Sequence, residues 1–133
     1  MNFHEFKVRV RYSETDQMGV VYHGNYAQYF EMGRVEWLRN LGLSYSYMEK
    51  NGIMLPVVSL TINYKKPARY DDLITVRTIL KKQQGVKIEF DYEIHNEAGE
   101  LLTTGSSVLV FVDMKIGRPV LPPDYVLEAL KKG

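Results

Sequence analysis

Residues 26–41 read YAQYFEMGRVEWLRNL, and apolar side chains recur in this stretch every three or four positions. That spacing gathers them along one side of an α-helix and leaves the charged residues on its other faces. A helix of about 17 residues is about 25 Å long. Gly42 follows directly, where a left-handed glycine commonly ends a helix. The periodic positions are Tyr26, Tyr29, Phe30, Gly33, Trp37 and Leu41, and Leu38 widens the apolar stripe.

Strand patterns dominate the remainder of the chain. Residues 86–95 alternate apolar with mostly charged side chains, which is the pattern of a strand with one face toward solvent. Similar runs predict strands at 5–12, 58–65, 73–80 and 101–112. Short turns join the later strands and favour antiparallel pairing. The order predicts an α+β fold, in which one long helix lies against one curved antiparallel sheet.

A short helix and a short amphipathic tail complete the predicted elements. Residues 44–50 form the first, with Ser44 as its N-cap and Asn51-Gly52 as its stop. Residues 125–130 form an amphipathic C-terminal segment. No repeat or linker divides the 133 residues, so we expect a single domain over 1–133.

Composition excludes several kinds of protein. The chain has no cysteine, which excludes thiol catalysis and thiolate metal sites, and His4, His23 and His95 lie too far apart for a short metal-binding motif. Seventeen basic against sixteen acidic residues give a net charge of +1, so we expect no nucleic-acid partner. No apolar run reaches the about 18 residues of a membrane span, and no signal peptide is evident. We therefore expect a cytoplasmic protein.

Oligomerisation is predicted from the shape of the fold. One helix cannot cover a five-stranded sheet, and edge strands need partners or protection. Tyrosines also cluster between Tyr12 and Tyr47, and tyrosine suits clefts and subunit interfaces. We expect a homodimer formed through sheet edges and the tyrosine-rich loop. The alternative is a monomer with charged edges.

The candidate chemistry lies just before the long helix, in residues 15–26. Asp16 follows a strand and precedes an apolar stretch, which predicts partial desolvation and hence a more basic carboxylate. His23 and Gly24 precede the helix, where unpaired N–H groups can stabilise an oxyanion. Each feature also has a structural interpretation, as a capping aspartate and as helix-entry residues. Together they favour acyl transfer or hydrolysis without a cofactor or metal, because Walker, dinucleotide and serine-elbow motifs are all missing.

The stretch from Arg9 to Leu41, with its core TDQMGVVYHGNY at residues 15–26, resembles the hotdog-fold acyl-CoA thioesterases of the 4-hydroxybenzoyl-CoA thioesterase family, in particular the bacterial branch associated with the Tol-Pal gene cluster. The resemblance implies a five-stranded antiparallel sheet wrapped around one long central helix, and a homodimer or homotetramer. It implies that Asp16 is the catalytic carboxylate and that His23 offers its backbone N–H, with its imidazole as a second contributor. The substrate-binding residues it implies are Tyr22, Gly24, Asn25 and Tyr26.

The implied reaction is hydrolysis of an acyl-CoA to a free acid and CoA. Asp16 would act either as a nucleophile or as a general base, and the sequence leaves both routes open. A hotdog acyl-thioester dehydratase or hydratase and a non-catalytic acyl-thioester binding module are the alternatives. The identity of the acyl group, whether short, long or aryl, stays open. Residues 81–85, KKQQG, differ from the arginine-rich patch that holds the CoA phosphates in some members of the family.

Overall fold

The long helix predicted from the sequence is the central element of the computed structural model, which describes residues 3–132. Helix α1 spans Tyr26–Asn40 and follows a 3-10 turn, η2, at His23–Asn25. Its apolar stripe is buried against the sheet. There the rings of Trp37 and Phe90 form a T-shaped contact with 5.1 Å between their centres. The Leu43 N–H bonds to the Leu38 carbonyl at 3.0 Å, and Gly42 has φ +83°. This left-handed ending confirms the predicted stop.

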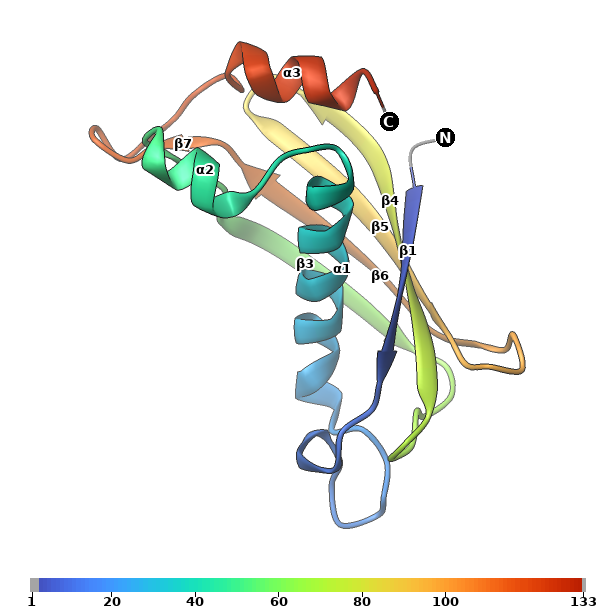
Figure 1. Cartoon of the computed structure of the whole chain (residues 1–133). Coiled ribbons are helices and arrows are strands. Elements are labelled where there is room, and N and C mark those ends of the chain that lie inside the picture. Colours follow the sequence, from blue (N-terminus) through green and yellow to red (C-terminus); the bar gives the residue numbers. More distant parts are fainter. Residues whose placement is uncertain (1–2, 133) are drawn as a thin grey trace.

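One five-stranded antiparallel sheet lies behind α1 and curves around it (Figure 1). Its strand order is β1-β4-β5-β6-β3, so β1 and β3 are the two edges. The predicted α+β class and five-strand sheet are confirmed. The strands are β1 Phe3–Arg9, β3 Val57–Tyr64, β4 Leu73–Gln84, β5 Lys87–His95 and β6 Leu101–Val110.

Close packing between α1 and the sheet depends on small residues. A Cβ at Gly33 would lie 2.7 Å from Cγ1 of Val76, and a Cβ at Gly105 would overlap the Phe30 ring. Phe30 also stacks on Tyr92 with 4.5 Å between ring centres. A side chain at either glycine would push the helix from the sheet, which explains why a glycine interrupts the apolar stripe.

The predicted strand boundaries differ most from the structure at three places. Residues 10–12 are not strand, because the chain turns after Arg9 into the 3-10 turn η1, Tyr12–Glu14. Strand β4 continues to Gln84, four residues beyond the predicted end, because it pairs with β5 along that length. The run predicted at 101–112 breaks at Phe111, since Val112 pairs with a different strand.

A second, three-stranded sheet was not predicted. It consists of β2 Ile53–Met54, β7 Val112–Asp113 and β8 Arg118–Pro119. Strands of two residues carry no periodicity, so only the tertiary structure defines them.

The two short helices lie toward one end of the sheet, away from the loop that precedes α1 (Figure 1). Helix α2 spans Tyr45–Lys50, and the Tyr47 N–H donates to Oγ of Ser44 at 3.0 Å, which confirms the predicted N-cap. Helix α3 spans Asp124–Leu130. Within residues 3–132 no helix combines the length and apolarity needed to cross a bilayer.

Candidate active site

The loop between η1 and η2 is a short hairpin that holds Asp16 at its base. Thr15 and Val21 form a bridge, and the Asp16 N–H donates to the Val20 carbonyl at 2.8 Å. Oδ1 of Asp16 accepts the Met18 N–H at 2.8 Å. Gly19, with φ +78°, allows the reversal. Oδ1 therefore orders the loop, and within residues 3–132 the other carboxylate oxygen, Oδ2, accepts no hydrogen bond.

The predicted desolvation of Asp16 was wrong for the single chain. Asp16 is exposed, and Met18 in the neighbouring apolar stretch is 81% exposed. Val21 is buried instead, held by the bond from its N–H to the Ala68 carbonyl. The loop thus turns its apolar residues in different directions and leaves Asp16 exposed.

The turn η2 leaves two backbone donors beside this loop. The Asn25 N–H bonds to the Tyr22 carbonyl at 2.9 Å, and the Tyr26 N–H bonds to the His23 carbonyl. Within the described residues 3–132, the N–H groups of His23 and Gly24 meet no protein acceptor. Unpaired donors at the start of a helical segment suit a developing negative charge.

A groove of about 320 Å³ brings several predicted site residues together. Asp16, His23 and Tyr26 all line it, whereas Tyr22, Gly24 and Asn25 do not. Its remaining lining residues are Val20, Val21, Tyr64, Lys65, Lys66 and Pro67. The groove is therefore formed by the Asp16 loop, the start of α1 and the end of β3.

The three predicted residues outside the groove have structural contacts. Nδ2 of Asn25 donates to the Glu14 carbonyl at 2.8 Å, which ties η2 to η1. The Tyr22 ring packs against the His23 imidazole with 4.4 Å between centres. Gly24 lies under that ring, because a Cβ there would be 2.7 Å from Cε2 of Tyr22. In the single chain these residues support His23.

Two tyrosines line the groove wall. The Tyr64 hydroxyl donates to the His23 carbonyl at 3.1 Å, and the Tyr26 hydroxyl accepts the Ala68 N–H at 3.3 Å. Burial raises the pKa of the Tyr26 phenol, so it stays protonated. The alternating pattern predicted only that Tyr64 lies in a strand. Its place in the site depends on the sheet register, which no local pattern reports.

Glu14 is a second residue that the sequence analysis missed. It is 5% exposed, and it accepts from the Arg11 N–H at 2.8 Å and from Nη2 of Arg11 at 2.9 Å. Burial alone would raise the pKa of Glu14, but the hydrogen bonds from Arg11 and Tyr29 outweigh it and lower the pKa. The spacing of Arg11 and Glu14 was the available signal, since it places the two side chains within reach of each other in a single turn.

The described residues 3–132 contain no group of three histidine or acidic side chains placed to hold a metal ion. The groove itself presents a carboxylate, an imidazole, phenols and lysines, with backbone donors beside it. That set suits hydrolysis of an activated carbonyl.

Comparison with known proteins agrees with a sheet that wraps one long helix, the architecture of hotdog thioesterases. The model of the thioesterase-like superfamily matches residues 10–130, so the chain belongs to this family. YneP of Bacillus subtilis is 42% identical over 120 residues, covering 90% of this chain and 87% of YneP. YbgC of Escherichia coli, named an acyl-CoA thioester hydrolase, is 34% identical over 122 residues, or 91% of each chain.

A solved structure of a thioesterase has the same fold as this chain. A DHNA-CoA thioesterase from Staphylococcus aureus superimposes with a TM-score of 0.94 at 41% identity, covering 99% of this chain and 91% of that one. These relatives confirm the resemblance to hotdog thioesterases and the expected enzyme class, a thioester hydrolase. They leave the roles of individual residues untested.

Proposed function

We propose that this protein hydrolyses acyl-CoA thioesters to a free acid and CoA in the groove beside Asp16. The observation that carries the proposal is that Asp16 and His23 line one groove, next to two backbone N–H groups that meet no acceptor within residues 3–132. A base or nucleophile on one side and oxyanion donors on the other are the two requirements of acyl transfer.

In the proposed reaction the thioester carbonyl oxygen accepts from the N–H groups of His23 and Gly24. Asp16 either takes a proton from a water that attacks the carbonyl carbon, or attacks it directly to form a mixed anhydride that water then cleaves. In both routes the C–S bond breaks, CoA leaves as a thiolate that takes up a proton, and the acid is released. The hydrogen bond from Tyr64 to the His23 carbonyl orients the turn that carries the donors.

Lys65 is our candidate contact for the CoA phosphates, in place of the KKQQG segment. Lys65 and Lys66 line the groove, whereas residues 81–85 lie in and after the end of β4. Nζ of Lys66 pairs with Glu100 at 2.7 Å, and Lys65 forms no ion pair with any carboxylate in residues 3–132. An exposed, unpaired lysine at the mouth of the groove is suited to an anionic ligand.

We further propose a homodimer joined along β3. In the described part of the chain β3 pairs only with β6, and its other edge is open. Val57, Val58 and Leu60 on this strand are 45%, 58% and 41% exposed, a run of apolar residues that an isolated edge strand would leave in water. Tyr64, at the end of the same strand, lines the groove, so a partner on this edge would also close over Asp16. A tetramer and a cytoplasmic location stay predictions.

The names of the relatives are our guide to the acyl group of the substrate. The Staphylococcus aureus structure is named for DHNA-CoA, and the Escherichia coli relative for acyl-CoA in general. We propose aryl and short aliphatic acyl-CoAs as the candidate substrates.

The test is release of free CoA, followed with a thiol reagent, across short aliphatic, long aliphatic and aryl acyl-CoAs. Loss of enoyl-CoA is followed in parallel. The proposal is supported if at least one acyl-CoA is hydrolysed and its rate of hydrolysis falls sharply in Asp16→Asn. Hydration of enoyl-CoA without CoA release would assign the dehydratase or hydratase class, and tight binding without turnover would assign a binding module.

A further inference from the structure

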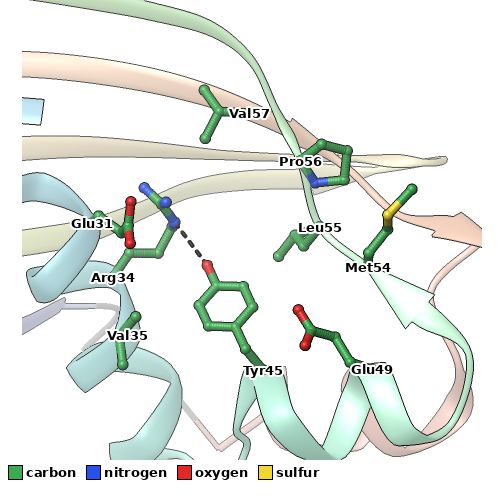
Figure 2. Close-up of a pocket in the computed structure, with 9 residues that line it drawn as sticks. All are labelled: Glu31, Arg34, Val35, Tyr45, Glu49, Met54, Leu55, Pro56 and Val57. Atoms are coloured by element: carbon green, nitrogen blue, oxygen red, sulfur yellow. Dashed lines mark hydrogen bonds between the residues drawn. The ribbon is translucent and has the colours of Figure 1, made fainter. Parts of the chain in front are cut away.

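A second pocket, of about 450 Å³, lies beside the middle of α1 and is separate from the Asp16 groove (Figure 2). Helix α1 contributes Arg34, helix α2 contributes Tyr45, and the segment before β3 contributes Leu55 and Pro56. None of its lining residues lines the Asp16 groove. The proposed hydrolysis uses no residue of this pocket.

The unusual feature of the pocket is a buried guanidinium. Arg34 is 6% exposed, yet it lines the cavity. Its Nε donates to the Tyr45 hydroxyl at 2.8 Å, and its Nη1 donates to the Tyr92 hydroxyl at 3.0 Å. The Tyr92 hydroxyl also hydrogen-bonds Oγ of Ser107 at 2.6 Å, so both tyrosines hold the guanidinium in one orientation.

The described hydrogen-bond partners of Arg34 are phenol hydroxyls and not carboxylates. Arg34 forms no ion pair with any carboxylate in residues 3–132. Burial raises the pKa of the Tyr45 hydroxyl even though the Arg34 cation opposes this, so Tyr45 is a neutral phenol and not a counterion. A guanidinium has five N–H groups, and two of them are used here. Buried cations are ordinarily paired, so an unpaired one at a cavity is an incomplete site.

The residues that line the pocket define what would complete it. Leu55, Pro56 and Val57 supply apolar walls, and two exposed glutamates, Glu31 and Glu49, also line the pocket (Figure 2). A ligand that reaches Arg34 would therefore carry one carboxylate, for the planar guanidinium fork, on an apolar body that contacts the walls. The exposed glutamates disfavour ligands with several negative charges.

We propose that the Arg34 pocket binds the carboxylate of a small organic acid with an apolar body. The pocket shares no lining residue with the Asp16 groove of the same chain, its Val57 wall belongs to the β3 edge at which we propose the dimer, and the inference stands whether or not the chain hydrolyses acyl-CoA. The same carboxylate chemistry arrives either as a free acid or at the far end of an acyl chain, and the experiment separates these sources.

The first measurement is binding of benzoate and hexanoate by calorimetry, with benzamide and hexanamide as neutral ligands of the same shape. We expect the acids to bind at least about tenfold more tightly than the amides, because hydrogen bonds to charged groups are the stronger ones. Arg34→Met should abolish this preference, and Arg34→Lys should retain only part of it, since lysine lacks the fork. The matched control is Arg39→Met, on the same helix but exposed and paired with Glu36, which should bind as the wild type does.

Asp16→Asn separates this proposal from the proposed function, because it should bind the acids normally while losing any hydrolysis. The source is then resolved by comparing hydrolysis of glutaryl-CoA and pentanoyl-CoA. If Arg34→Lys lowers the glutaryl-to-pentanoyl ratio of kcat/KM about tenfold, the carboxylate arrives on the acyl chain. An unchanged ratio, together with lost binding of free acid, identifies the free acid.

Equal affinity for acids and amides would overturn the proposal, as would an acid preference that survives in Arg34→Lys and Arg34→Met alike. Should Arg34→Met fail to fold, Arg34→Lys still carries the comparison. A merely structural arginine would lower the melting temperature in these variants and leave the acid-to-amide preference of the folded protein unchanged.

Discussion

The Tyr29 phenol donates a 2.8 Å hydrogen bond to Oε1 of Glu14, which joins helix α1 to the turn just before Asp16. The Glu14 backbone carbonyl accepts from the Tyr22 N–H and from Nδ2 of Asn25, so one residue holds both ends of the loop that carries the candidate catalytic groups. Burial first, and then the hydrogen bond to Glu14, raise the pKa of Tyr29, which keeps this phenol a donor. The position of Asp16 relative to His23 thus depends on Glu14.

The first prediction concerns Glu14→Gln and pH. The folded pKa of Glu14 lies below the ordinary 4.5, so its ionised form stabilises the protein above that pH, and the contribution is lost as pH falls through the folded pKa. The variant should therefore have a lower melting temperature than wild type at pH 7, and the difference should shrink below about pH 4.5. Thermal unfolding of both proteins from pH 7 to pH 3 measures this. Glu128→Gln, at an exposed pair with Lys131, is the control and should show a small difference at every pH.

The second prediction concerns Asp16→Asn. Asparagine keeps the oxygen that accepts the Met18 N–H but removes the charge, so kcat should fall about 100-fold or more, with the melting temperature unchanged. Asp113→Asn is a matched control, because Oδ1 of Asp113 accepts the Lys115 N–H at 2.8 Å in a similar turn. Steady-state hydrolysis measures kcat, and thermal unfolding measures the melting temperature, for both variants. Full activity in Asp16→Asn, or lost stability with normal turnover, would make Asp16 a loop residue only.

The third prediction separates the imidazole of His23 from its backbone. His23→Ala keeps the N–H that we assign to the oxyanion, so kcat should fall by less than about tenfold, well short of the loss at Asp16. The Tyr64 hydroxyl should still bond to the carbonyl at position 23, which keeps the turn in place. An equal and severe loss at both positions would instead assign the imidazole itself to the reaction.

The fourth prediction tests the CoA contact. Lys65→Gln should raise KM several-fold with little change in kcat, and should weaken the dependence of KM on salt, because one phosphate contact is removed. Lys81→Gln, on β4, should leave both constants unchanged. The opposite result, an effect at Lys81 and none at Lys65, would move the CoA phosphates to the β4 end and contradict the proposed binding mode.

The fifth prediction concerns assembly. In a two-fold pair of β3 strands, Leu60→Glu brings a charge close to its own copy, so the dimer should weaken by at least about tenfold. Activity should fall at dilutions where the variant is monomeric. Leu121→Glu, at a leucine 70% exposed outside the strands, should stay dimeric and active. Sedimentation and turnover are measured on the same samples, and an active monomer would show that the groove is complete in one chain.

Much of the fold followed from local pattern alone. The apolar stripe of residues 26–41 predicted α1, Ser44 predicted the cap of α2, and the alternation at 86–95 predicted β5. These features are readable because helix and strand periods are imposed by geometry within a few residues. The end of β1 at Arg9 and the two-residue strands escaped prediction, because they depend on pairing with distant segments.

The candidate site likewise has a part that the sequence predicted and a part that only the tertiary structure defines. Residues 15–26 determined by themselves that a carboxylate and a helix start lie close together, since only seven positions separate Asp16 from His23. Tertiary structure alone decided that Asp16 is exposed in the single chain and that Tyr64 and Lys65 share its groove. It also decided that Arg34 is buried beside Tyr45 and forms no ion pair within residues 3–132. Exposure and charge pairing are sums over neighbours from the whole chain, and no short segment contains that information.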